Sequence, residues 1–107
     1  MSHDYEAQRA DTFETFTQMG TEISLPKMAI VDFQFYPDDI DAQWDALEAA
    51  LRDKGFKTTR YEDEETLDAS IGPIEVNPES IWKYERIATE VALKFDFNPD
   101  GWGLVED

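Results

Sequence analysis

The sequence predicts an α+β fold in which a four-stranded antiparallel sheet carries two helices on one face, with a further helix at the N-terminus. Two observations predict it. Segments that alternate apolar and polar residues, as strands do, are interleaved with segments whose apolar residues recur every three or four positions, as in helices. In addition, 107 residues with 41% hydrophobic side chains are enough to form the core of one domain.

The N-terminal segment predicts a helix over residues 4–19, with Gly20 as its stop. We therefore divide the chain into an N-terminal helical extension, residues 1–25, and a main α+β domain, residues 26–107. The apolar residues of the predicted helix are only loosely aligned along one side. That side must pack either on the main domain or on a partner.

The first strand is predicted over residues 27–36, because every second residue along it is apolar and these side chains share one face. Its other face is partly apolar as well, which indicates a central strand of the sheet. Pro37 ends the strand, and we expect Asp38 or Asp39 to cap the helix that follows.

This helix is predicted from a single apolar stripe formed by Ile40, Trp44, Leu47 and Leu51. Charged residues occupy the opposite side, so that side should face water. Gly55 stands where a left-handed residue commonly ends a helix.

Two further strands are predicted over residues 56–61 and 66–76. They are joined by four acidic residues, 62–65, which no core could bury, and together they indicate a hairpin. Gly72 and Pro73 interrupt the second of these strands and predict a bulge or bend.

Asn77 and Pro78 predict the start of another helix, because asparagine caps helices well and proline fits the first helical position. A short last strand is expected over residues 101–105. The order strand, helix, strand, strand, helix, strand is that of the ferredoxin-like sandwich. One sheet face is then left for the N-terminal helix, a second copy in a homodimer, or a partner. The buried stripe of the helix comprises Ile81, Tyr84, Ala88, Val91, Ala92 and Phe95.

Charge restricts the partners. Twenty-five acidic against nine basic residues give a net charge of -16, which repels nucleic acid backbones and anionic membranes. The same field attracts a basic protein surface, including one that ordinarily holds RNA. Because the chain lacks cysteine, a membrane-length apolar run and the start of a signal peptide, we expect it in the cytoplasm.

Few side chains are suited to catalysis. The single histidine, His3, is expected in a frayed and exposed end, and there is no cysteine to act as nucleophile or zinc ligand. Carboxylates are plentiful, but they cluster in turns and on polar helix faces rather than in a dry pocket. We therefore predict no catalytic residue, no cofactor and no enzymatic activity.

Residues 96–107 partly match the calcium-binding loop of EF-hand proteins. Pro99 interrupts the loop, and Gly103 replaces its usual apolar residue, so a turn is the simpler interpretation and we predict no metal site. The residues that match are Asp96, Asn98, Asp100, Gly101 and Asp107.

Trp102 stands between two glycines near the end of the chain. It can either plug the core, with the glycines letting the backbone turn beside it, or lie at the centre of an interface with a partner. We favour the first interpretation, because the second is the less common use of tryptophan.

The ending Phe-Asp-Phe-Asn-Pro-Asp-Gly-Trp-Gly, after a capped amphipathic helix, resembles the regulator of ribonuclease activity B family. Asp100, Gly101, Trp102 and Gly103 match its Asp-Gly-Trp-Gly signature, for which we expect a structural role. Pro99 departs from the pattern, since many members have tyrosine there. The likeness extends backward to the N-terminal helix and covers nearly the whole chain.

The resemblance implies a bacterial α/β sandwich that binds the C-terminal, non-catalytic region of the endoribonuclease E and inhibits it without performing chemistry. That region carries basic RNA-binding segments, which suits a charge of -16. Two alternatives stay open. One is a small-molecule or calcium-binding α+β module, and the other is an acidic mimic that binds several basic RNA-binding proteins.

Overall fold

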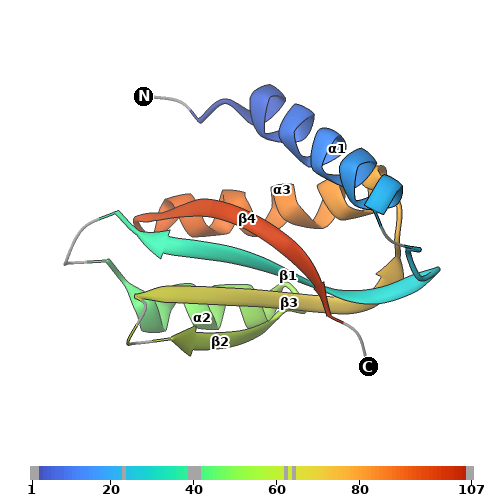
Figure 1. The fold of residues 1–107 in the computed structure, drawn as a ribbon. Helices are drawn as coiled ribbons and strands as arrows, with labels where there is room; N and C mark the ends of the chain where they lie inside the picture. The colour runs from blue at the N-terminus through green and yellow to red at the C-terminus, as the bar shows by residue number, and fades with distance from the viewer. Residues whose placement is uncertain (1–2, 23, 39–41, 62, 64, 106–107) are drawn as a thin grey trace.

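A computed structural model describes the chain except residues 1–2, 23, 39–41, 62, 64 and 106–107. A helix comes first and is followed by strand, helix, strand, strand, helix and strand, which is the predicted order (Figure 1). The elements are α1 (Tyr5–Glu22), β1 (Met28–Pro37), α2 (Trp44–Asp53), β2 (Lys57–Tyr61), β3 (Thr66–Glu75), α3 (Pro78–Lys94) and β4 (Phe97–Val105).

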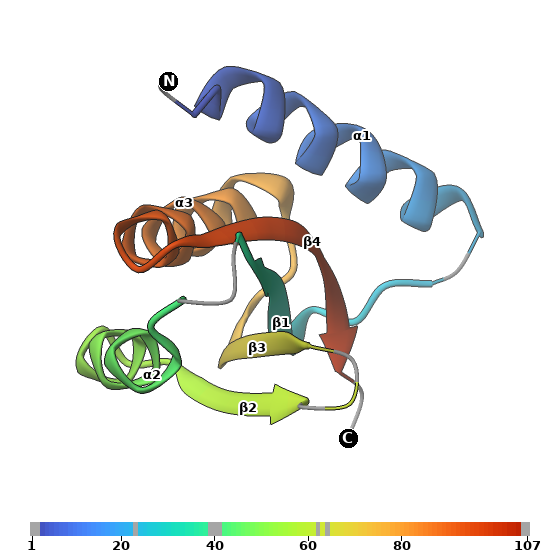
Figure 2. The same cartoon turned by 90° about the vertical axis from the view of Figure 1, so that its left-hand side faces the viewer.

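The four strands form one antiparallel sheet in the order β2-β3-β1-β4, so β1 is central, as its two apolar faces predict. Figure 2 shows α2 and α3 on the same side of this sheet. A four-stranded sheet of this order with two helices on one face is the ferredoxin-like sandwich. The predicted fold class is confirmed.

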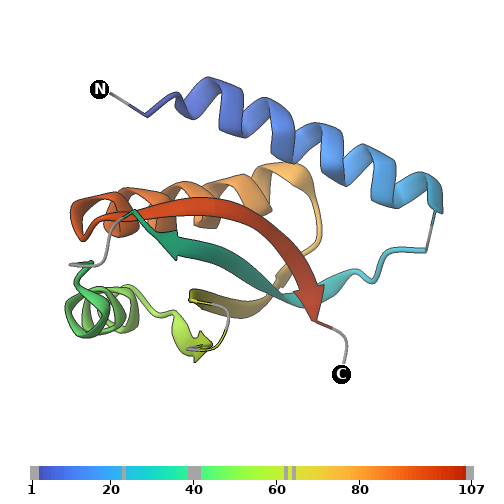
Figure 3. The same cartoon turned by 60° about the vertical axis from the view of Figure 1, so that its left-hand side comes forward.

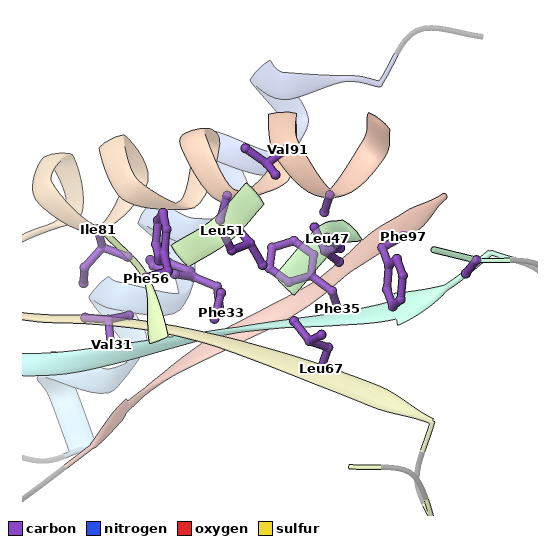
Figure 4. Packing of buried hydrophobic residues seen from close by; sticks show 14 of the residues in the cluster. Val31, Phe33, Phe35, Leu47, Leu51, Phe56, Leu67, Ile81, Val91 and Phe97 are labelled. Carbon is purple, nitrogen blue, oxygen red and sulfur yellow. The ribbon is translucent and has the colours of Figure 1, made fainter. Parts of the chain in front are cut away.

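The core lies between the sheet and these two helices. Alternation along β1 turns Val31, Phe33 and Phe35 toward the helices, where each is at most 1% exposed. Figure 4 shows them meeting Leu47 and Leu51 of α2 and side chains of α3. Burying large apolar side chains in this way supplies most of the stability of a small domain.

Local signals place the end of α2 and the start of α3 as predicted. Gly55 has a φ of 96°, its N–H donates to the carbonyl of Arg52, and the N–H of Phe56 donates to the carbonyl of Leu51. This is the Schellman arrangement that ends many helices. At α3 the side chain of Asn77 accepts a 2.7 Å hydrogen bond from the N–H of Ser80.

The start of α2 was predicted wrongly. The helix begins at Trp44, and its N-cap, Gln43, makes no capping hydrogen bond through its side chain. Asp38 instead joins the start of β4: its N–H donates to the carbonyl of Asp96, and its carboxylate accepts from Asn98. Pairing with β4 therefore holds Asp38 away from the helix. Asp39 and Ile40 lie outside the described residues.

α1 continues past its predicted stop at Gly20 to Glu22, because glycine weakens a helix without necessarily ending it. The helix lies along α3, beside β4 (Figures 2 and 3). It does not cover the sheet face opposite α2 and α3, which faces the viewer in Figure 1. Within the described residues this face presents the exposed rings of Tyr36 and Tyr61.

The bulge predicted in β3 is present. The pairing of β1 with β3 shifts register between Ala29 and Val31, opposite Gly72, which has a φ of 132°. A Cβ atom at Gly72 would lie 2.9 Å from the carbonyl oxygen of Ala29 and from the backbone nitrogen of Ile74. Both the conformation and the space require glycine here.

Candidate functional site

The Asp-Gly-Trp-Gly segment lies in β4, at one edge of the sheet. The predicted turn over residues 96–101 is therefore mostly strand, because Phe97 and the residues after it pair with β1. Phe33 pairs with Trp102 and Phe35 with Pro99, so β4 carries one extra residue between these pairs. Such a bulge bends an edge strand, and Gly101 accommodates it with a φ of 108°.

The bulge turns the four segment residues to different surroundings. Asp100 and Gly101 are exposed, whereas Gly103 is half-buried. Trp102 is also half-buried and packs against the edge of the core. One side of Trp102 therefore contacts the core while the remainder is available to a cavity beside it.

That cavity, which we call the α1–β4 pocket, has a volume of about 340 Å³. It is bounded by α1, by α3 and by the bulge of β4, and it includes three of the four residues of the Asp-Gly-Trp-Gly segment. Its lining consists of Gln8, Asp11, Thr12 and Thr15 from α1, Glu85 from α3, and Pro99, Asp100, Gly101 and Trp102 from β4.

A buried carboxylate, Glu85, forms the α3 side of the pocket with only 4% exposure. The hydroxyl of Thr12, itself 2% exposed, donates a hydrogen bond to one oxygen of Glu85. One turn away, the side chain of Gln8 donates a 2.9 Å hydrogen bond to the hydroxyl of Thr89. α1 is thus attached to α3 by polar contacts, and the one between Thr12 and Glu85 is buried, which makes it stronger than the same contact in water.

Burial raises the pKa of the Glu85 carboxyl above its ordinary value, because the charged form loses its hydration. Hydrogen bonds from Thr12 and Gln8 favour the charged form and offset part of this rise, while the neighbouring Asp11 adds to it. The pKa of this carboxyl group should therefore change when a charged group enters the pocket.

The pocket is acidic. It carries the carboxyl groups of Asp11, Glu85 and Asp100, and no lysine or arginine is among the described residues that line it. A concave surface with charges of one sign concentrates the field of those charges. The arrangement suits a positively charged group.

The sequence did not identify Glu85 and Thr12 as site residues, because polar side chains on predicted helices are expected to face water. A signal was present: Gln8 and Thr12 on α1, and Glu85 and Thr89 on α3, are each four residues apart and so share one helix face. Matching polar pairs on two helices fit a polar contact between them. His3 was also misjudged, because it is half-buried and its Nε2 lies 2.6 Å from the side-chain oxygen of Gln8.

A second cavity, of about 510 Å³, lies between the end of α1 and the segments that lead into β1 and α3. Met28, one of its lining residues, is 52% exposed. It is lined by Phe16, Leu25, Pro26, Lys27, Met28, Glu75, Val76 and Asn77, a set that is more apolar than the lining of the α1–β4 pocket.

The described residues of the calcium-like loop have different surroundings. Asn98 and Asp100 lie along β4, where Asn98 bonds to Asp38 and Asp100 lines the pocket, and Asp107 is outside the described residues. In the described part of the chain, no three histidine, cysteine, aspartate or glutamate side chains are grouped to hold a metal ion. No helix among the described residues is long and apolar enough to span a membrane.

Fold and pocket together define a small ferredoxin-like α+β protein with an added N-terminal helix and an acidic pocket beside its edge strand. A family model described as regulator of ribonuclease activity B matches residues 6–104, from the first turn of α1 almost to the end of β4. The chain therefore belongs to this family, whose description is the regulation of ribonuclease activity. Comparison with curated proteins gave no match.

Proposed function

We propose that this chain is a non-catalytic inhibitor of the endoribonuclease E, and that it acts by binding the C-terminal, non-catalytic region of that nuclease in the bacterial cytoplasm. The observation that carries the proposal is the family match over residues 6–104, which includes α1, the α1–β4 pocket and most of β4. A regulator of a nuclease needs a surface that its target recognises.

Charge supports the choice of target. A net charge of -16 on a chain of this length favours contact with a surface rich in lysine and arginine. Segments that hold RNA are such surfaces, because they neutralise phosphates. Binding of this acidic chain would compete with RNA for those segments, which gives inhibition without a chemical step.

The geometry supports a role without catalysis. Glu85 is the carboxyl group in the pocket with a raised pKa. Its hydrogen-bond donor is the hydroxyl group of Thr12, a residue that is only 2% exposed, so a substrate cannot reach that hydroxyl group. The ring of His3 lies near Glu85, but its hydrogen bond is to the side chain of Gln8. These contacts are suited to holding α1 in position.

The test is isothermal titration of this chain against full-length ribonuclease E and against its separate N-terminal and C-terminal halves from the same organism. We expect binding to the full-length enzyme and the C-terminal half, and a marked loss of affinity between low and moderate salt. The same mixtures should show slower cleavage of a structured RNA by the full-length enzyme only. Absence of binding to both the full-length enzyme and the C-terminal half would refute the proposal.

A further inference from the structure

In the part of the chain that the structure describes, no lysine or arginine forms an ion pair with a carboxylate of the α1–β4 pocket, whereas three other carboxylates, those of Asp45, Glu48 and Glu90, do form such pairs. Glu48 bonds to Arg52 and Arg60, and Glu90 bonds to Arg86. Asp11 and Asp100, in contrast, form no ion pair with any described residue. The hydrogen bonds that Glu85 receives come from neutral side chains.

The chain also shows how the same groups hold an arginine internally. Between α2 and β2 the guanidinium group of Arg60 lies 5.2 Å from the centre of the Trp44 ring. Asp45 and Glu48 accept its hydrogen bonds, one of 2.6 Å to Asp45. A tryptophan with two flanking carboxylates is thus a complete arginine site in this fold.

The α1–β4 pocket has the same set of groups without the arginine. Trp102 lines the cavity together with Asp100 of the bulge and Asp11 of α1, and both of these aspartates are exposed. The volume of about 340 Å³ is left open by the side chains of the chain itself. The position therefore has the aromatic wall, the carboxylates and the space for a guanidinium group from another molecule.

We propose that the α1–β4 pocket receives an arginine side chain of the protein partner, with its guanidinium group against Trp102 and its N–H groups directed to Asp11 and Asp100. The inference rests on the proposed function for the identity of the partner, whereas the chemistry of the contact rests on the pocket. Arginine fits better than lysine because its planar fork donates in several directions and stacks on an aromatic ring.

Glu85 gives this contact a second property. An arriving cation favours the ionised form of a carboxyl group, and burial has raised the pKa of this one, so binding should release a proton. The other titratable groups near Glu85 are His3, which precedes α1, Asp11 of α1 and Asp100 of β4. The affinity should therefore rise with pH through the range just above the ordinary glutamate value.

The first test places an arginine of this chain in the pocket. Thr15 is an exposed residue of α1 that lines the cavity, and Thr15→Arg should fill it and exclude the arginine of the partner. Thr17→Arg is the matched control, because Thr17 is exposed on the same helix, does not line the pocket and gives the same change in charge. We expect Thr15→Arg to weaken binding of the ribonuclease E C-terminal half by about 10-fold to 100-fold relative to Thr17→Arg.

The second test needs no nuclease. The indole N–H signals of the three tryptophans are followed by NMR while N-acetyl-argininamide is added, with uncharged N-acetyl-citrullinamide as the control. We expect a saturating shift of the Trp102 signal with the arginine compound alone. Replacing Asp11 and Asp100 by asparagine should abolish that shift, whereas Asp53→Asn, an exposed residue of α2, should leave it unchanged.

The outcomes separate the two proposals. If the nuclease binds the Thr15→Arg and Thr17→Arg variants equally well, or if both small compounds shift Trp102 alike, the arginine pocket is refuted while the proposed function stands. If the unaltered chain fails to bind the nuclease but Trp102 responds to the arginine compound as expected, the proposed function is refuted and the chemistry assigned to the pocket is supported.

Discussion

Replacing Thr12 by valine should loosen α1 from the rest of the fold. Valine has the size and the β-branched shape of threonine, so the packing and the helix propensity change little. What disappears is the hydroxyl that donates to Glu85, at a position where the two residues are 2% and 4% exposed. Water cannot replace this donor easily, and the carboxylate is left with less compensation for its lost hydration.

The magnitude follows from the charge and the burial of the acceptor. A hydrogen bond to a charged group contributes about 1.5–3 kcal/mol, and an unsatisfied buried acceptor costs a similar amount. We therefore expect the Thr12→Val variant to lose about 2 kcal/mol of unfolding free energy. For a domain of this size, that loss corresponds to a fall in Tm of roughly 8–16 °C.

The assay is urea unfolding followed by circular dichroism at pH 7, with hydrogen exchange to locate the change. The control is Thr17→Val, because Thr17 lies on the exposed side of α1 and its hydroxyl bonds only to the carbonyl of Phe13 in the same helix. Faster exchange should be confined to α1 and the facing turns of α3. The reasoning is refuted if Thr12→Val stays within about 0.5 kcal/mol of the unaltered chain, or if Thr17→Val loses as much.

Three further predictions concern stability. The pKa of Glu85 is raised above the unfolded value of 4.5, so the folded chain holds this proton to higher pH than the unfolded chain does. The free energy of unfolding should therefore fall as the pH rises from 4.5 through the raised pKa of the folded chain. The free energy of unfolding is measured over a series of pH values for the unaltered chain and for the Glu85→Gln variant. The fall that Glu85 causes should appear in the unaltered chain and be absent from the variant. Gly72→Ala should cost more than about 2 kcal/mol by chemical unfolding, since its Cβ would clash with backbone, whereas Gly103→Ala, which meets nothing within 4 Å, should be nearly neutral. Asn77→Ala should cost about 1 kcal/mol in the same assay, through the lost cap of α3.

The parts of the fold that were predictable are those encoded within a few residues. The alternation along β1 identified its buried face, and Gly55 and Asn77 identified helix ends because their conformations and hydrogen bonds are satisfied by near neighbours. Asp38 shows the limit of such signals. Its carboxylate is suited to cap a helix, but pairing with a strand some 60 positions later in the chain took precedence.

The candidate site was less predictable, because it is built from elements distant in the sequence. The Asp-Gly-Trp-Gly segment was recognised from its residues, but the extended form of β4 around it depends on pairing with β1. Glu85 was missed for a similar reason. Its burial depends on α1, and the sequence around α3 does not indicate that another helix covers the face of α3 on which Glu85 lies.

The polar attachment of α1 has a consequence for binding. Since the α1–β4 pocket needs both α1 and β4, a partner that occupies it binds only chains in which α1 is docked, and so stabilises the docked form. By thermodynamic linkage, undocking of α1 must in turn weaken binding of the partner. The apparent affinity is the intrinsic affinity multiplied by the fraction of molecules in which α1 is docked. Under the proposed arginine contact, Thr12→Val should therefore weaken binding to the nuclease once its α1 is undocked in a substantial fraction of molecules, although Thr12 would not touch the partner. A loosely amphipathic helix held by Gln8 and Thr12 is in this sense a part of the binding site.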